Sequence, residues 1–331
     1  MTTAIEIDNL TKDYEVGFLR KRRVRALDSL TLRVERGEIF GFLGANGAGK
    51  STTMKLLMRL MYPSGGRARI LGRDIGDVST RARVGYLPEH PYFYDYLTAR
   101  ELLEYCAELF GYRSAERRRR AADLLARVRL EEKSWDKQLR KFSKGMLQRV
   151  GLAQALVNDP EVVFLDEPMS GLDPVGRREV RDLIAAQRER GATVFFSTHI
   201  LSDIEVLCDR AAVLRRGRLA HSGRLEDLRS AAGDSRPMEI VVSGAAAAAL
   251  GGALSGQGAR VIPTPGGARV EVDSEREIDA ALAALRAVAG ARLVSVQPVG
   301  NPLEELFAGD SEGAAPDPDS PRGAAGLTPS G

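Results

Sequence analysis

The sequence predicts an α/β fold followed by a small α+β domain. Short apolar runs at 38–44, 162–168 and 193–199 are rich in β-branched and aromatic residues, which is typical of parallel strands buried on both faces. Segments with helical spacing lie between these runs, and such alternation indicates a parallel sheet covered by helices. Residues 238–299 instead follow the order β-α-β-β-α-β, which predicts a split βαβ domain.

The remaining elements of the α/β part can be assigned in chain order. Residues 4–10 and 29–36 alternate apolar and polar side chains, as half-buried strands do. Helical spacing is found at 51–61, 98–130 and 146–157. The last two segments predict a helical insertion between the first buried strand and the second. The charged segment 17–25 is expected to be a solvated loop, although contact with anionic lipid head groups stays open.

Changes in composition suggest where the domains begin and end. Glycine, aspartate and proline gather at 233–237, so the first domain is expected to cover 1–232, with its helical subdomain at about 90–157. The small βαββαβ domain would then cover 233–308. Residues 309–331 are rich in Gly, Pro, Asp and Ser, and this composition predicts a disordered tail.

Charge, cysteine content and hydropathy exclude several classes of protein. A net charge of +3 is too small to indicate nucleic-acid binding. The two cysteines, Cys106 and Cys208, form no C-x-x-C pair, which argues for a reducing compartment and against a cysteine metal site. No apolar run is long enough for a membrane span, and no signal peptide is visible. The sequence thus predicts a cytoplasmic protein, and any membrane-spanning part would belong to another chain.

The clearest motif follows the first buried strand and matches G-x-x-x-x-G-K-S/T. It consists of Gly44, Ala45, Asn46, Gly47, Ala48, Gly49, Lys50, Ser51 and Thr52. In such a loop consecutive backbone N–H groups and the start of the next helix face a phosphate. Lys50 is expected to reach the β- and γ-phosphates of a nucleotide, and the Ser51 hydroxyl to bind Mg²⁺.

A pair of carboxylates ends the second buried strand. Asp166 and Glu167 follow four apolar residues, so they should lie at the carboxyl edge of the sheet, where ligands bind in open α/β folds. Asp166 is expected to hold Mg²⁺ through water. Glu167 could orient or deprotonate the water that attacks a phosphate.

The order of these motifs resembles the ATP-binding cassette (ABC) ATPases. The resemblance covers residues 4–230 and implies a P-loop NTPase fold, with a RecA-like core, an antiparallel β subdomain and a helical subdomain. Phe142-Ser143-Lys144-Gly145-Met146 aligns with the family signature L-S-G-G-Q, although Lys144 replaces a glycine and Met146 a glutamine. In the family, Ser143 and Gly145 would contact the γ-phosphate of ATP bound to a second cassette.

Other site residues follow from the same resemblance. Asp173, in Ser170-Gly171-Leu172-Asp173, would lie in the loop that crosses the dimer interface. His199 would be the switch histidine that reaches the γ-phosphate and the attacking water. Tyr14 would stack on adenine; the alternative is a core or edge tyrosine. Glu89 stands where most members have a glutamine that joins Mg²⁺ to the membrane partner, so it is a candidate metal ligand whose role is open. The aromatic run 90–96 fits either an interface or packing of the helical insertion.

The resemblance implies an ATPase that uses ATP and Mg²⁺. Two cassettes, as a homodimer or paired with a second type of chain, would enclose two ATP molecules and drive a separate transmembrane permease. The chain would act on the cytoplasmic face of the membrane, without a specific nucleic acid. The motifs are most similar to the drug-resistance and sodium-export branch, which implies export. A soluble regulatory or translation-linked cassette is the alternative, and the substrate is not encoded in this chain.

Overall fold

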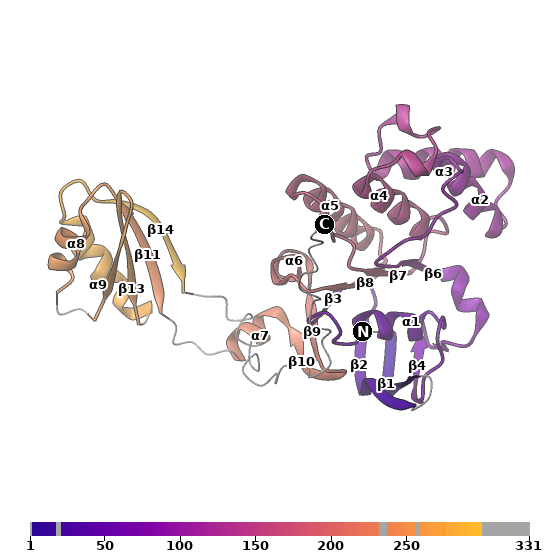
Figure 1. Ribbon diagram of the computed structural model, residues 1–331, viewed down its shortest axis with the longest axis horizontal. Helices are drawn as coiled ribbons and strands as arrows, with labels where there is room; N and C mark the ends of the chain where they lie inside the picture. Colours follow the sequence, from indigo (N-terminus) through magenta and orange to yellow (C-terminus); the bar gives the residue numbers. More distant parts are fainter. Residues whose placement is uncertain (1, 18–20, 232–236, 256–257, 274, 300–331) are drawn as a thin grey trace, which may run out of the picture. The chain divides into compact units, whose positions relative to one another are not determined.

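The computed structural model describes residues 2–17, 21–231, 237–255, 258–273 and 275–299. These residues form two compact units, Met1–Ala231 and Ala232–Gly331 (Figure 1). The tail expected at 309–331 lies outside the described residues.

The first unit is built on a six-stranded sheet of order β10-β9-β3-β8-β7-β6. Its strands are β3 (Ile39–Leu43), β6 (Val84–Leu87), β7 (Val162–Asp166), β8 (Thr193–Thr198), β9 (Arg210–Arg215) and β10 (Arg218–Arg224). All neighbours pair in parallel except β9 and β10, which form an antiparallel hairpin. Every residue of β3, β7 and β8 is buried. Because of this two-sided burial, these strands are continuous apolar runs in the sequence.

A second, antiparallel sheet has the order β2-β1-β4-β5. It consists of β1 (Thr3–Val16), β2 (Arg22–Glu35), β4 (Gly65–Ile70) and β5 (Arg73–Asp74). Helix α1 (Lys50–Leu57) contributes Met54 to a core that also contains Ile5 and Leu27 of this sheet and Phe42 and Phe195 of the other. One apolar core therefore joins both sheets through α1.

The structure corrects part of the prediction of a solvated loop at 17–25, of which residues 18–20 lie outside the described residues. Residues 22–25 are exposed, as expected, but they belong to β2, which pairs with β1 as far as Val16. Asp13 carries ion pairs to Arg23 and Arg25 on the neighbouring strand. Cross-strand pairs of opposite charge stabilise an exposed hairpin, and this compensation is not visible in a run of basic residues read alone.

Helices α2 (Ala99–Leu109), α3 (Ser114–Arg127) and α4 (Lys144–Ala155) pack against one another in a separate layer, and α4 also contacts β6 (Figure 1). Short 3-10 helices lie at Val78–Arg83, Glu132–Ser134 and Leu139–Lys141. The helical pattern at 98–130 is divided because Gly111 adopts a left-handed φ of +83° after α2. The first unit is completed by α5 (Pro174–Glu189), α6 (Leu201–Leu207) and α7 (Leu225–Ala231).

The second unit contains an antiparallel sheet of order β12-β13-β11-β14. Its elements are β11 (Met238–Ser243), α8 (Ala247–Ala253), β12 (Arg260–Thr264), β13 (Gly267–Val272), α9 (Glu275–Arg286) and β14 (Arg292–Pro298). Ile240, Val270 and Leu250 belong to one core that is separate from that of the first unit. Across the parts of the chain that the structure describes, no helix is both long and apolar enough to span a bilayer.

Candidate active site

The phosphate-binding loop connects β3 to α1 with a backbone that only glycine tolerates at two positions. Gly47 and Gly49 have φ values of +80° and +108°. A Cβ on Gly49 would also lie 2.7 Å from the carbonyl oxygen of Ala26, and one on Gly44 would lie 2.6 Å from that of Leu214. The backbones of β2 and β9 therefore pack so closely against the loop that these two positions have no room for a side chain. No side chain caps α1, so its first N–H groups are available to an anion.

Lys50 is the first residue of α1, and its ammonium group lies inside the loop. It is only 6% exposed. Its Nζ donates hydrogen bonds to the carbonyl oxygens of Gly44 (2.7 Å) and Ala45 (3.4 Å). It also lies 3.2 Å from Glu167 Oε1, an ion pair without hydrogen-bond geometry. A buried ammonium needs such partners, and here one of them is the residue that follows β7.

Asp166 ends β7 and is held by a serine on the adjacent strand. The register of β7 and β8 pairs Asp166 with Ser197, whose hydroxyl donates to Asp166 Oδ1 at 2.6 Å. Burial raises the pKa of Asp166, while hydrogen bonds from Ser197 and Ser51 lower it and the charges of Glu89 and Glu167 raise it. The structure therefore brings together Ser51, Asp166 and Glu167, three residues that the sequence assigned to one site.

Glu167 adopts a left-handed backbone conformation, with φ of +49°, which is uncommon for a residue other than glycine. Its N–H donates to Ser197 Oγ at 2.9 Å, so the same hydroxyl group contacts both acidic residues. His199 Nδ1 lies 2.9 Å from Glu167 Oε2. The carboxylate is buried, but the His199 side chain is 44% exposed. Solvent can therefore reach the imidazole while Glu167 stays enclosed.

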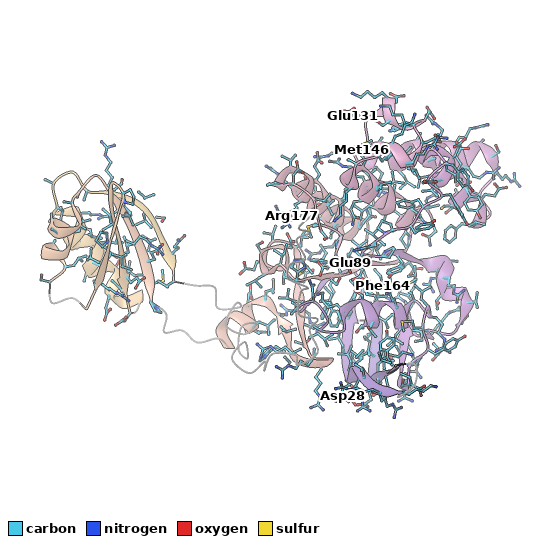
Figure 2. The ribbon with its side chains drawn as sticks, viewed as in Figure 1. Asp28, Glu89, Glu131, Met146, Phe164 and Arg177 are labelled. Carbon is cyan, nitrogen blue, oxygen red and sulfur yellow. The ribbon has the colours of Figure 1, made fainter. Side chains whose placement is uncertain are left out.

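Glu89 follows β6, two residues after the strand ends. Its side chain is 43% exposed and lies 4.0 Å from His90. Its charge reaches Asp166 and contributes to the raised pKa of that residue, after the larger effect of burial. Figure 2 shows Glu89 between the antiparallel sheet and the helical layer. Within the described residues no cluster of three or more His, Cys, Asp or Glu side chains could hold a metal without other ligands.

Tyr14 lies near the end of β1, with its hydroxyl group 3.4 Å from Thr52 Oγ1 and 3.3 Å from Met61 Sδ. Lys12 Nζ lies over the ring, 5.3 Å from its centroid. The tyrosine is thus attached to α1, the helix that follows the phosphate-binding loop. This attachment keeps the ring at a fixed distance from the loop.

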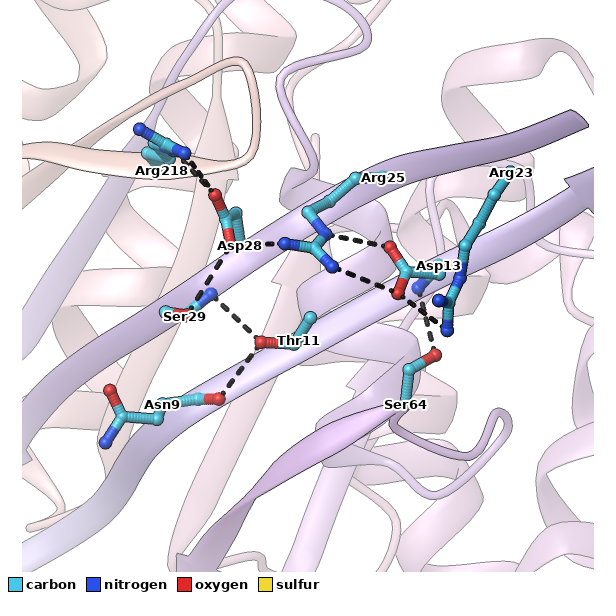
Figure 3. A network of polar contacts seen from close by, with 9 residues as sticks. All are labelled: Asn9, Thr11, Asp13, Arg23, Arg25, Asp28, Ser29, Ser64 and Arg218. Carbon is cyan, nitrogen blue, oxygen red and sulfur yellow. Dashed lines mark hydrogen bonds and ion pairs between the residues drawn. The ribbon is translucent and has the colours of Figure 1, made fainter.

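An ionic network joins β1, the strand that carries Tyr14, to β2 and β10 (Figure 3). Arg25 Nε donates to Asp13 at 2.9 Å, and Arg25 Nη1 reaches Asp28 at 3.1 Å. Arg218 of β10 donates to the second oxygen of Asp28 at 2.7 Å. The hydrogen bond from Arg25 and nearby positive charges hold the pKa of Asp13 below its ordinary value. The antiparallel sheet is thereby joined to the β9–β10 hairpin, whose Gly217 N–H donates to the carbonyl oxygen of Ala48 at 2.9 Å.

Comparison with known proteins decides the family. Residues 27–170 match the family described as ABC transporter. An ABC transporter ATP-binding protein of Synechocystis is 51% identical over 248 residues, which cover 75% of this chain and 69% of that protein. The chain belongs to the ABC transporter family. It is an ATP-binding subunit of that family, and its ABC ATPase domain implies ATP hydrolysis.

Two further comparisons extend this assignment. The daunorubicin resistance ATP-binding protein DrrA3 of Streptomyces coeruleorubidus is 36% identical over 278 residues, covering 83% of this chain and 82% of that protein. The ATP-binding cassette MJ0796, solved as a dimer in a post-hydrolysis state with ADP and Pi, is 28% identical. The structural match covers 67% of this chain and 98% of the MJ0796 chain, with a TM-score of 0.61. The predicted ABC fold is thus confirmed.

The signature residues of this ABC ATPase form a second cluster. Ser143 caps α4 and accepts a hydrogen bond from the N–H of Met146 at 3.3 Å. A Cβ on Gly145 would lie 3.4 Å from Leu172 Cδ2. Asp173 caps α5 by accepting from the N–H of Gly176 at 2.8 Å. Gly145 therefore lies beside the turn after β7, while Ser143 and Asp173 each cap the helix that they begin. Among the described residues, none of these contacts is with the phosphate-binding loop.

Two polar residues of the cassette escaped the sequence reasoning. Ser197 contacts both Asp166 and Glu167, and its only sequence signal is its place two residues before His199 at a strand end. Gln148 is buried in α4 and donates to the carbonyl oxygen of Pro168 at 2.9 Å. The only signal for Gln148 in the sequence is a polar residue on the buried face of a helix. Its partner could not be predicted, because it is a backbone carbonyl 20 residues away.

Proposed function

We propose that this chain is the energising subunit of an exporter: two copies enclose two ATP molecules, and ATP binding and hydrolysis drive a separate transmembrane permease. Glu167 acts as the general base and His199 as the switch residue. The observation that carries the proposal is the convergence of Lys50, Asp166, Glu167 and His199 at the carboxyl edge of the parallel sheet. This edge is where open α/β sheets bind ligands.

The chemistry follows from the position of each group. The loop N–H groups and Lys50 bind the β- and γ-phosphates, with Lys50 exchanging its loop carbonyls for phosphate oxygens. Glu167 takes a proton from the attacking water as the bond between the β- and γ-phosphates breaks. His199, 2.9 Å from Glu167, orients that carboxylate and remains accessible from solvent. Tyr14 offers a π-face to adenine, and its contacts with Thr52 and Met61 position the ring.

The donor set fits Mg²⁺. The hydroxyl of Ser51 and the carboxylates of Asp166 and Glu89 are hard oxygen ligands, and protein groups alone do not form a closed cage. Such an open arrangement suits a cation that takes its remaining ligands from phosphate and water. When bound, Mg²⁺ would neutralise charge that develops on the phosphate oxygens. Ser197 fixes the Asp166 carboxylate for this purpose.

A second cassette is proposed because one chain gathers its site residues in two separate clusters. Gly145 faces Leu172 of its own chain, and Ser143 caps its own helix, α4. Neither residue has a described contact with the phosphate-binding loop of the same chain, so a partner would have to supply them to a bound γ-phosphate. The dimer of MJ0796 supports this arrangement. Closure then depends on the γ-phosphate as a shared contact, and hydrolysis removes it. The unit that begins at Ala232 is proposed to be an accessory domain of this dimer.

Export is proposed from the resistance protein DrrA3, which matches most of this chain. The chain would then sit on the cytoplasmic face of the membrane, bound to a permease. Affinity purification of the tagged protein from detergent-solubilised membranes tests this function. We expect a polytopic membrane protein that co-purifies and stimulates ATP hydrolysis, and Lys50→Ala should retain that partner but abolish the hydrolysis. Purification with ribosomes, or as a lone soluble ATPase, would favour the regulatory alternative.

A further inference from the structure

Gln148 lies in α4 and contacts the backbone one residue after the proposed general base, Glu167. The side chain is 4% exposed. Its Nε2 donates a hydrogen bond of 2.9 Å to the carbonyl oxygen of Pro168, the residue after Glu167. Leaving a buried carbonyl oxygen without a hydrogen bond costs free energy, so this hydrogen bond stabilises the folded state. It is a side-chain link between the helical layer and the end of β7.

The backbone at Glu167 needs such support. A left-handed φ of +49° is strained for glutamate, and strained residues persist only where their surroundings hold them in place. Ser197 Oγ accepts from the N–H of Glu167 on one side of the residue. The N–H of Ser170 donates to the carbonyl oxygen of Glu167 at 3.0 Å. Gln148, on α4, adds a hydrogen bond to the carbonyl oxygen of Pro168, the next residue in the chain.

Two other contacts attach the start of α4 to the same turn. Lys144 lies across Gly171, since a Cβ there would be 2.4 Å from Lys144 Nζ and 2.8 Å from Lys144 Cε. Gly145 faces Leu172. The signature motif and the turn after Glu167 therefore share contacts along the first turn and a half of the helix. α4 also packs against α2 and α3, so it can transmit a movement of that layer.

We infer that Gln148 is a positioning residue that ties the catalytic carboxylate of Glu167 to the signature motif of the same chain. When Ser143 and Gly145 engage the nucleotide held by the partner, α4 is fixed, and Gln148 fixes the carbonyl group of Pro168, the residue after Glu167. Each site would then be fully active only when the chain's own signature motif is engaged. This inference rests on the proposed function, because it assumes that Glu167 is the general base.

The test compares Gln148→Met, which keeps the length of the side chain but removes the donor, with Gln154→Met as the matched control on the same helix. Gln154 makes no side-chain hydrogen bond in the described part of the chain. We expect Gln148→Met to lower kcat by about tenfold to a hundredfold, since small misplacements of a catalytic group have effects of this size. The KM for ATP should stay within about twofold, because the phosphate-binding loop is untouched. Gln154→Met should change neither.

A pH profile separates positioning from a general loss of structure. In Gln148→Glu, a protonated carboxyl group can donate to the carbonyl oxygen of Pro168, but a carboxylate cannot. The ratio of its kcat to that of Gln148→Met should therefore rise as the pH falls. The inference would be overturned if this ratio did not change with pH. It would also be overturned if Gln148→Met raised the KM for ATP by as large a factor as it lowered kcat.

Glu167→Gln serves as the reference. If it hydrolyses ATP normally, the general-base assignment fails; if it is inactive and Gln148→Met is fully active, only the role of Gln148 fails.

Discussion

Lys50 Nζ and His199 Nδ1 contact opposite oxygens of one carboxylate, at 3.2 Å from Glu167 Oε1 and 2.9 Å from Glu167 Oε2. Lys50 begins the helix after β3, Glu167 follows β7, and His199 follows β8. The strands are parallel, so their carboxyl ends meet at one edge of the sheet. The sheet topology thereby joins residues that are more than a hundred positions apart in the chain.

Replacing Glu167 by glutamine should abolish hydrolysis but preserve ATP binding. The amide cannot accept the proton of the attacking water, so turnover should fall by at least about a hundredfold. The closed dimer should then accumulate with ATP bound, because the γ-phosphate contact is not removed. Phosphate release and light scattering with ATP measure the two effects. Glu189→Gln, on the exposed end of α5, is the control, and normal turnover by Glu167→Gln would rule out the general-base role.

Tyr14 should contribute to ATP affinity through its ring rather than its hydroxyl group. Tyr14→Phe keeps the π-face and should leave the KM for ATP within about twofold, since stacking needs only the ring. Tyr14→Leu should raise it by about tenfold, because stacking on a base contributes about 1–3 kcal/mol. The KM of each variant is measured from its ATPase rate, and equilibrium binding of ATP checks that the change in KM reflects a change in affinity. An equal loss in Phe and Leu variants would instead indicate that the contact with Thr52 matters.

The sequence predicted those parts of the site that depend on local order, and missed those that depend on strand register. The glycines of the loop and the apolar strand before Asp166 are readable because backbone geometry and burial restrict residue type. Ser197 was missed because its role arises from pairing opposite Asp166. The extended β1–β2 hairpin was missed for the same reason, since the charges of Arg23 and Arg25 are neutralised by Asp13 across the strands.

Asp166→Asn should make the protein more stable at neutral pH while it abolishes activity. Burial raises the pKa of Asp166 above its ordinary value of 3.8, so the folded state disfavours the charged form. The resulting penalty is absent below pH 3.8, grows as the pH rises through the folded pKa, and is fully present above it. Asparagine avoids this penalty and can still accept from Ser197. The melting temperature should therefore rise by a few degrees, given a shift of about 2–4 °C per kcal/mol.

Calorimetry without Mg²⁺ or nucleotide measures this difference at pH 7 and again near the acid limit of stability. The advantage of Asp166→Asn should shrink as the pH falls, because the aspartate then becomes neutral as well. Asp95→Asn is the control, since Asp95 is exposed. A variant that is less stable than the parent at pH 7 would mean that the carboxylate has a stabilising partner in the folded protein.

Glu89→Gln should retain hydrolysis and shift its pH dependence. Burial is the main cause of the raised pKa of Asp166, and the charge of Glu89 adds to it. Removing that charge lowers the pKa of Asp166, so the acid limb of the rate profile should move to lower pH. The loss of one carboxylate should also weaken Mg²⁺ in the presence of ATP by roughly two- to fivefold, because ligand charge sets the affinity for hard cations. Titration of the ATPase rate with Mg²⁺ at several pH values measures both changes, with the more distant Glu189→Gln as the control. If neither the acid limb nor the Mg²⁺ requirement changes, the half-exposed Glu89 side chain does not serve the metal site, and the permease becomes its expected partner.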